Sequence, residues 1–276
     1  MNNLIKESLK KLKQKNINNP ELDLRILLKH ASKKNNEIIL SNFNIENINL
    51  RKFFSAFDRR IKGEPVSKIY NSKSFWKHNF FVNKDVLDPR PDTEIIIEKV
   101  LEHYPETNKF IKILDLCTGS GCLAVSLAKE YPNSKITATD ICPAAIKVAK
   151  KNAILMNCAN QIKFLNCDLI NEKDLFDIVV ANPPYLSKYE YGSISPNIHK
   201  YEPKIALLAS RGGYEFYWKI ANILNSILNI NAKIFVEIGF SQADKVINIF
   251  SSKRLLCLKV EKDIQNLNRL LILNKS

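Results

Sequence analysis

From Glu94 onward the sequence alternates short apolar segments with amphipathic ones, and no other feature constrains the fold as strongly. The predicted strands are Lys112–Leu116, Lys135–Thr139, Gln161–Cys167, Phe176–Ala181, Lys233–Ile238, Leu255–Val260 and Arg269–Leu273. The predicted helices are Glu94–Tyr104, Cys122–Tyr131, Pro143–Met156, Gly213–Leu228 and Ser241–Phe250. Repeated β-α-β units imply a mostly parallel sheet with helices on both faces. We therefore expect a Rossmann-like α/β fold with seven strands, whose ligands bind at the carboxyl ends of the strands.

The first predicted strand ends in a glycine-rich turn that leads directly into a helix. The turn reads Asp115-Leu116-Cys117-Thr118-Gly119-Ser120-Gly121. Glycine has no Cβ, so Gly119 and Gly121 allow a tight turn and leave space for a ligand beside the backbone. A purely structural strand-to-helix turn is the alternative for this segment considered alone.

Polar residues also end the next three predicted strands. Asp140 ends the second strand, where nucleotide-binding folds place a carboxylate that accepts hydrogen bonds from ribose hydroxyls. Asp168 ends the third strand and Asn182 ends the fourth. Four unrelated strand caps are the structural alternative. Because carboxyl ends of parallel strands meet at one edge of a sheet, a shared ligand site is the favoured interpretation.

Asn182-Pro183-Pro184-Tyr185 is the most specific local element of the chain. Each proline fixes its φ angle and lacks an N–H donor, so the segment presents carbonyl acceptors in a rigid frame. The Asn182 side-chain oxygen and a backbone carbonyl can together accept both hydrogens of an NH₂ group, and the Tyr185 ring can stack on a planar group. The segment thus indicates methyl transfer to a planar NH₂ group, and a glutamine amide and an adenine both qualify.

The first part of the chain has a different pattern of apolar residues. Residues 1–63 show leucine and isoleucine at helical spacing, with Asn19-Pro20 as a helix start and a further helix at Leu50–Ile61. That last helix is expected to place its aromatic side chains on one face, either in the core or against a partner; they are Phe53, Phe54 and Phe57.

Residues 64–87 are short, aromatic-rich runs that predict a β-hairpin linker. The extended runs are Lys68–Tyr70, Ser74–Trp76 and Asn79–Val82. The prolines of Asp88-Pro89-Arg90-Pro91-Asp92-Thr93-Glu94 delay the next helix until Asp92 or Thr93 can cap it. Residues 88–276 then form the predicted catalytic domain.

Composition narrows the class of protein without deciding its function. The 276-residue chain has a formal charge of +14, which allows a nucleic-acid partner, but its lysines are scattered, so we expect no requirement for direct nucleic-acid binding. The sequence shows no apolar run of membrane-spanning length and no export pattern, so we expect a cytoplasmic location. The six cysteines form no metal-binding pattern, so we expect reduced thiols and no metal site.

In combination, these motifs resemble the class I methyltransferase pattern, and within it the release-factor glutamine methyltransferases. The resemblance runs through nearly the whole chain, including Asp23 and Leu27-Leu28 in the helical part. Its motifs are Gly63-Glu64-Pro65-Val66, Phe75-Trp76, Pro89 to Glu94, Asp115 to Gly121, Asn182 to Tyr185, and Tyr201-Glu202-Pro203 with Ala206-Leu207.

The resemblance implies methyl transfer from S-adenosylmethionine to the side-chain amide of the glutamine in the Gly-Gly-Gln motif of peptide chain release factors. It assigns the cofactor's methionine part to Cys117, Thr118, Gly119, Ser120 and Gly121, the ribose to Asp140, and the adenine to Asp168 and Leu169. It assigns the substrate amide to Asn182, Pro183, Pro184 and Tyr185, with Asn182 also beside the cofactor.

The resemblance further implies that the helical domain binds the release factor. Separately, we expect a monomer. Two departures from the family pattern are Leu169, where an aromatic often packs on adenine, and Ser210-Arg211-Gly212-Gly213, which replaces a usually acidic turn. The alternative is an adenine-specific nucleic-acid methyltransferase, because the same tetrapeptide can hold a flipped base. The helical first domain favours the protein substrate.

Overall fold

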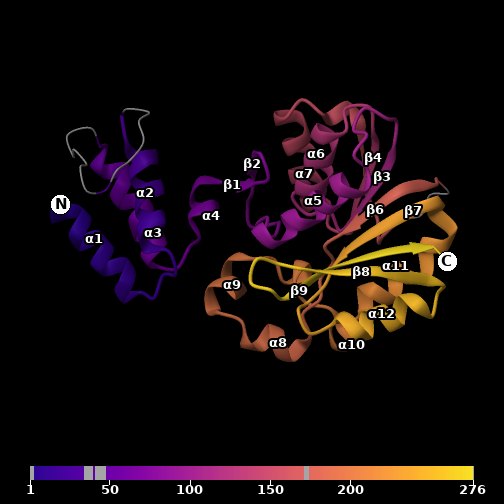
Figure 1. Cartoon of the computed structure of the whole chain (residues 1–276). Coiled ribbons are helices and arrows are strands. Elements are labelled where there is room, and N and C mark those ends of the chain that lie inside the picture. Colours follow the sequence, from indigo (N-terminus) through magenta and orange to yellow (C-terminus); the bar gives the residue numbers. More distant parts are fainter. Residues whose placement is uncertain (1–2, 34–39, 41–47, 171–173, 276) are drawn as a thin grey trace. The chain divides into compact units, whose positions relative to one another are not determined.

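The computed structural model describes residues 3–33, 40, 48–170 and 174–275, in two compact units formed by residues 1–71 and 72–276 (Figure 1). Each unit has its own apolar core. In the described ranges, no helix has both the length and the apolar character that a membrane crossing needs.

The smaller unit is a helical bundle. Its helices are α1 (Asn3–Gln14), α2 (Pro20–Ala31), α3 (Leu50–Ile61) and α4 (Val66–Tyr70). Pro20 occupies the first turn of α2, as predicted. Apolar side chains from these helices, such as Leu24 and Phe53, are fully buried. An ion pair of 2.6 Å between Arg60 and Asp23 connects α3 to α2 beside this core.

Two predictions for this unit are wrong. Residues 68–70 are helical and not extended, because Pro65 starts a short helical turn that ends at Asn71 with a positive φ of 52°. Phe54 is 44% exposed, whereas Phe53 and Phe57 are buried, because residues four apart share a helix face and adjacent residues do not. The part of the predicted helical domain at 34–39 and 41–47 lies outside the described residues.

The larger unit contains a two-stranded hairpin and a seven-stranded sheet. The hairpin is β1 (Ser72–Phe75) with β2 (His78–Phe81), as predicted. The sheet order is β5-β4-β3-β6-β7-β9-β8, with antiparallel pairing only where β9 meets β7 and β8 in these strands. The strands are β3 (Lys112–Leu116), β4 (Lys135–Asp140), β5 (Ile162–Asn166), β6 (Phe176–Ala181), β7 (Leu228–Glu237), β8 (Leu255–Lys262) and β9 (Asn268–Lys275).

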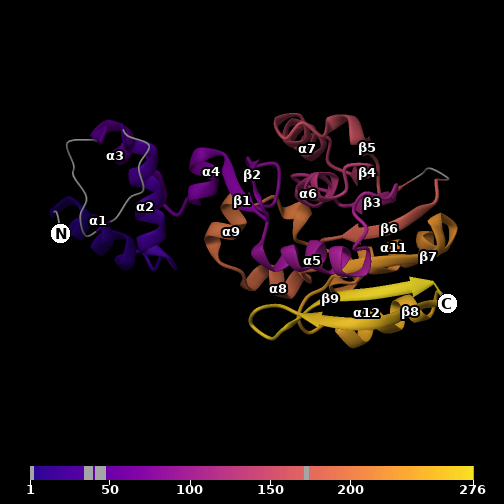
Figure 2. The same ribbon diagram turned by 45° about the horizontal axis from the view of Figure 1, so that its top comes forward.

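Helices cover both faces of this sheet (Figure 2). One apolar core packs α5 (Glu94–His103), α6 (Cys122–Glu130) and α7 (Pro143–Leu155) against the sheet. The other core packs α11 (Glu215–Ile227) and α12 (Ala243–Ser251) against the opposite face. The predicted α/β class, its seven strands and its mostly parallel sheet are therefore confirmed.

Several short elements follow β6 that periodicity did not predict. They are α8 (Lys188–Ser193), α9 (Pro196–Tyr201), η5 (Lys204–Ala206) and α10 (Ser210–Gly213), and two other short turns are η3 (Pro91–Thr93) and η4 (Ala159–Gln161). The buried carboxylate of Glu202, just after α9, accepts hydrogen bonds from the Asp88 backbone N–H at 3.2 Å and from Arg90 at 3.2 Å. These bonds fix the proline-rich segment before α5 against the segment after β6.

Candidate active site

A cavity lies at the carboxyl ends of β3, β4, β5 and β6, where the strand pattern predicts a ligand. The predicted site residues that line it are Cys117, Thr118, Gly119, Ser120, Asp140, Asp168, Leu169, Asn182 and Pro184. Much of the remaining wall is formed by other segments: residues 85–90, Thr93, Ile205, Ala206 and Phe216. Segments that are distant in the sequence are thus brought to one place by the sheet.

The two glycines of the turn after β3 have different structural roles. Gly119 has a φ of +54° and lines the cavity, and a Cβ there would meet only the Cys117 carbonyl oxygen at 4.0 Å. Gly121 has a φ of +79°, and a Cβ there would lie 3.0 Å from the Ala149 Cβ on α7. The space expected beside Gly121 is therefore filled by α7, and only Gly119 leaves the backbone open to a ligand.

Asp140, at the end of β4, fixes the loops around the cavity. Its Oδ2 accepts a hydrogen bond from the Gly119 backbone N–H at 2.9 Å, and its Oδ1 accepts one from the Cys142 N–H at 2.8 Å. Burial raises the pKa of this carboxyl, while the two backbone donors act in the opposite direction. Each oxygen keeps a further lone pair, so the carboxylate can still accept from a ligand hydroxyl.

Asp115, at the buried end of β3, holds the same turn from behind. Its Oδ2 accepts from the Thr118 hydroxyl at 2.5 Å and from the Ala124 N–H at 3.2 Å. Burial raises the pKa of Asp115 to about 7, with the nearby charge of Asp140 adding to the effect. Its Oδ1 is buried and has no hydrogen-bond partner among the described residues. Two carboxyl groups at this edge favour a cationic ligand, since a positive charge would stabilise both in ionised form.

The third predicted position lies nearer to solvent. Asp168 forms an ion pair of 2.9 Å with Lys219 on α11, and both side chains are partly exposed. Leu169 is 7% exposed, adopts a positive φ of 64° and contributes its side chain to both the core and the cavity wall. The two residues thus give this side of the cavity one polar and one apolar group.

Asn182 lies where this cavity meets a second one. The second cavity is lined by Leu87, Arg90, Asn182, Tyr185, Leu186, Ile194, Ile198, Ala206, Leu207 and Glu237. Leu87, Arg90, Asn182 and Ala206 line both cavities. Pro183 is buried and lines neither of them. A group bound in the first cavity and a side chain bound in the second would therefore meet at Asn182.

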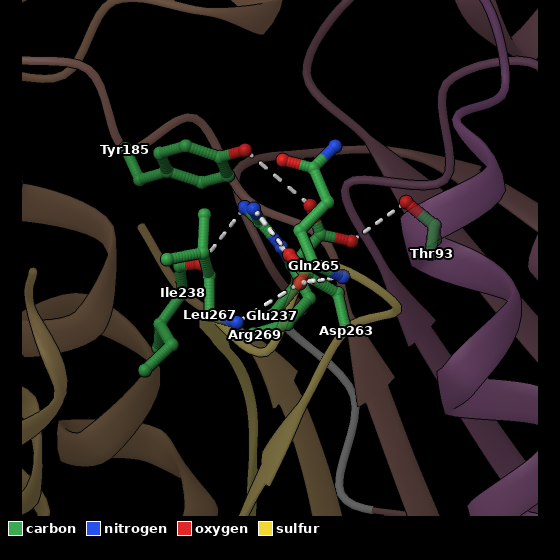
Figure 3. A network of polar contacts seen from close by, with 8 residues as sticks. All are labelled: Thr93, Tyr185, Glu237, Ile238, Asp263, Gln265, Leu267 and Arg269. Carbon is green, nitrogen blue, oxygen red and sulfur yellow. Dashed lines mark hydrogen bonds and ion pairs between the residues drawn. The ribbon is translucent and has the colours of Figure 1, made fainter. Parts of the chain in front are cut away.

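The Asn182 side chain is held from behind by a chain of hydrogen bonds. Its Nδ2 donates to the Thr93 hydroxyl at 3.0 Å, and that hydroxyl donates to Glu237 Oε2 at 2.6 Å. Tyr185 donates its phenol to the other oxygen, Glu237 Oε1, at 3.4 Å (Figure 3). Of the two predicted caps of α5, Thr93 is the N-cap residue, but its side chain makes no cap hydrogen bond because its hydroxyl donates to Glu237.

The backbone of Tyr185 is fixed as well. Gln242 donates a hydrogen bond from Nε2 to the Tyr185 carbonyl at 3.0 Å. Gly213 lies so close to that carbonyl that a Cβ at this position would overlap the oxygen. The Ser210 to Gly213 turn, which departs from the family pattern, thus packs directly behind the tetrapeptide.

Glu237 is the functional candidate that the sequence interpretation missed. It ends β7, is 2% exposed, and burial raises its pKa to about 7. The signal was present: Glu237 is the one charged residue in the apolar run Ile234-Phe235-Val236-Glu237-Ile238, at a strand end like Asp115 and Asp140. For its partner Thr93, the sequence predicts only a helix cap.

Comparisons with known proteins agree with this geometry. The PrmC N-terminal domain family model matches residues 3–70, and the Methyltransferase small domain model matches residues 83–198. A release factor glutamine methyltransferase from Clostridium acetobutylicum is 35% identical, over 91% of this chain and 90% of its own length. One from Clostridium botulinum is 32% identical, over 94% of each chain.

The chain belongs to the release factor glutamine methyltransferase family. A bifunctional methyltransferase from Rickettsia bellii is 37% identical over 97% of this chain, but the match covers only 53% of that protein. The chain thus spans about half the length of such bifunctional relatives. A solved structure of ribosomal protein L11 methylase from Lactobacillus delbrueckii subsp. bulgaricus aligns with a TM-score of 0.50 at 18% identity, over 68% of this chain and 80% of that one. This likeness supports the methyltransferase fold.

Proposed function

We propose that the protein transfers a methyl group from S-adenosylmethionine to the side-chain amide nitrogen of the glutamine in the Gly-Gly-Gln motif of peptide chain release factors. The observation that carries the proposal is the placement of Asn182 at the junction of two cavities with its amide orientation fixed. Membership of the release factor glutamine methyltransferase family supports the choice of substrate.

The residues of the first cavity fit the proposed cofactor. The open backbone at Gly119 admits the methionine part beside Cys117, Thr118 and Ser120. Asp140 keeps acceptor capacity for ribose hydroxyls. The adenine would lie against Asp168 and Leu169, which line the same cavity. Carboxyl groups in a low-dielectric site favour a sulfonium cation.

The second cavity fits the amide substrate. Asn182 donates a hydrogen bond from Nδ2 to Thr93, so its Oδ1 remains available as an acceptor. This Oδ1 has no hydrogen-bond partner within the described part of the chain. A backbone carbonyl of the rigid Pro183-Pro184 segment can accept the second hydrogen of the substrate NH₂. The Tyr185 ring and the aliphatic wall can enclose the flat glutamine side chain.

Catalysis in this scheme is mainly positioning. S-adenosylmethionine would supply a methyl group on positively charged sulfur and leave as the neutral thioether S-adenosylhomocysteine, while the amide nitrogen gains the methyl and loses a proton to solvent. Asn182 and the backbone carbonyl hold the nitrogen in one orientation for an in-line displacement, and such orientation is worth up to about 7–11 kcal/mol in well-organised systems. No side chain needs to remove the proton beforehand.

The helical unit is proposed to bind the release factor. This assigns roles to residues 1–63 as the recognition domain, 64–87 as the linker and 88–276 as the catalytic domain. The match of residues 3–70 to the PrmC N-terminal domain model supports a separate role for the first segment. The expected monomer belongs to the same proposal.

Incubation of the protein with labelled S-adenosylmethionine and either a release factor or DNA tests the substrate. We expect label in the release factor and none when its Gly-Gly-Gln glutamine is replaced by alanine. Label that appears only in DNA would overturn the proposal and establish the adenine alternative, for which the tetrapeptide is equally suited.

A further inference from the structure

The hydrogen bonds behind Asn182 have a defined direction. The Thr93 hydroxyl has one hydrogen, and the 2.6 Å contact to Glu237 Oε2 uses it. The same oxygen is then available to Asn182 only as an acceptor. Thr93 can therefore accept from the Asn182 Nδ2–H but cannot donate to Oδ1.

This direction decides which end of the Asn182 amide serves the substrate. The oxygen and the NH₂ of an asparagine have nearly the same shape, so only hydrogen bonding distinguishes the two orientations. With Nδ2 bound to Thr93 at 3.0 Å, Oδ1 is left to accept a hydrogen bond from the substrate NH₂, whose nitrogen receives the methyl group. In the reversed orientation, the Asn182 NH₂ would face the substrate NH₂, and donor would oppose donor.

Building on the proposed function, we propose that Glu237 and Thr93 are positioning residues for methyl transfer: the Glu237 carboxylate orients the Thr93 hydroxyl, which orients the Asn182 amide. Glu237 ends β7, Thr93 lies in η3 before α5, and Asn182 follows β6. The arrangement therefore couples three separate segments at the point where the two cavities meet.

The surroundings of Glu237 keep its carboxylate available as an acceptor. It is faced by Thr93 and Asp92 from η3, Tyr185 after β6, Arg269 of β9 and Tyr217 of α11. Arg269 lowers the pKa of Glu237, against the larger effect of burial. Arg269 is itself held by Asp263 through bonds of 2.9 and 3.1 Å, at the turn between β8 and β9 (Figure 3).

Protonation of Glu237 would reverse the direction of these bonds. A protonated carboxyl can donate to Thr93, whose hydrogen is then free to donate to Asn182 Oδ1 and hold that oxygen away from the substrate. Burial raises the pKa of Glu237 to about 7. The fraction of correctly oriented Asn182 should consequently rise with pH through this range.

The decisive variant is Thr93→Val, which keeps the β-branched shape but can neither donate nor accept. Thr93→Ser restores the hydroxyl. Thr137→Val is the matched control, because Thr137 is a buried threonine on β4 that lines neither cavity. Each variant is purified as the full chain, checked by thermal melting and calorimetric S-adenosylmethionine binding, and assayed for methylation of a release factor.

We expect Thr93→Val to lower kcat by about 10- to 100-fold, the size of effect seen when a reacting group is misplaced. Thr93→Ser should recover most of the rate, and Thr137→Val should keep it. Because Thr93 also lines the first cavity, kcat is compared at saturating S-adenosylmethionine for each variant. The wild-type to Thr93→Val rate ratio should shrink as the pH falls from about 8 to about 6, since protonation of Glu237 disables only the wild type. Asp115 also has a pKa near 7, but any effect of its protonation on the rate is common to both proteins and cancels in that ratio.

An unchanged kcat in folded Thr93→Val would overturn the proposal, as would a rate ratio that does not vary with pH. Failure of Thr93→Ser to recover activity would contradict it as well. The proposed function has a separate readout: if the wild type methylates DNA and not the release factor, the substrate assignment fails, and the same variants are then compared on DNA.

Discussion

The sheet edge has two comparable parts: the cofactor end, at the proposed S-adenosylmethionine site after β3, and the acceptor end, at the proposed amide site around Asn182. Each contains a buried carboxyl that accepts a hydrogen bond from a threonine. At the cofactor end, Asp115 accepts from Thr118 at 2.5 Å, and at the acceptor end Glu237 accepts from Thr93 at 2.6 Å. Burial raises the pKa of both carboxyl groups to about 7. The first pair lies within one turn, whereas the second joins residues 144 positions apart.

The difference in span corresponds to a difference in task. The hydrogen bond between Asp115 and Thr118 lies within the turn that directly follows β3. Loss of this bond should therefore loosen the cofactor site alone. The Glu237 pair connects β7 with η3 and, through Asn182, with the end of β6. Its loss should disturb the geometry of the reaction while leaving the cofactor bound. Variants at the two ends should therefore separate affinity from rate.

The largest effect is expected from Asn182→Ala at the acceptor end. Removal of the Oδ1 acceptor should lower the rate of methyl transfer by about 10³-fold or more, because a preorganised acceptor is lost at the reacting centre. S-adenosylmethionine binding, measured by calorimetry, should remain detectable. Full activity of this variant on a release factor would remove Asn182 from the catalytic site.

The next effect concerns stability and pH. The folded protein binds a proton at Glu237 more tightly than the unfolded chain does, since burial raises the pKa from 4.5 to about 7. Stability from this group is therefore fully present below about pH 4.5 and is lost as the pH rises through about 7. Denaturation at pH 5 and pH 8 should show that Glu237→Gln flattens this dependence by about 3 kcal/mol. If Glu237→Gln left the pH dependence of the free energy of unfolding unchanged, the pKa of Glu237 would not be raised in the folded protein.

At the cofactor end, Asp140→Ala should weaken S-adenosylmethionine binding by about 10- to 100-fold. Two backbone N–H groups lose their acceptor, and in the proposed site the ribose would lose its own, at about 1.5–3 kcal/mol for a hydrogen bond to a charged group. Titration calorimetry measures the affinity directly. An affinity equal to the wild type would exclude Asp140 from the cofactor site.

The smallest effect is expected from Thr118→Val, the counterpart of the Thr93 variant. The valine cannot donate to Asp115, so the turn after β3 should loosen and cofactor affinity should fall by about tenfold, the equivalent of roughly one hydrogen bond. The rate at saturating cofactor should stay within about threefold of the wild type. A large loss in kcat with normal affinity would show that the two ends do not differ in task.

The sequence predicted the local parts of this site better than the distant ones. Asp140 and Asn182 were predicted because a polar group at the end of an apolar strand lies at the ligand edge of a parallel sheet, and both line the first cavity. Glu237 obeys the same rule and was overlooked. The contact of Thr93 with Glu237 could not be predicted, because no periodicity links residues 144 apart.

The short elements after β6 escaped prediction for a related reason. α8 and α9 have six residues each, too few to show a helical period, and their ends are set by capping at Ser187 and Ser195. Likewise, the space beside Gly121 was expected to be open, because only the folded structure shows Ala149 of α7 there.

Locating the transferred methyl group tests the central claim most directly. A release factor incubated with the protein and S-adenosylmethionine is digested, and the Gly-Gly-Gln peptide is fragmented in a mass spectrometer. We predict one additional methyl group on the glutamine side chain with the wild type and none with Asn182→Ala. A methyl group on another residue, or an unmodified peptide beside methylated DNA, would contradict the account.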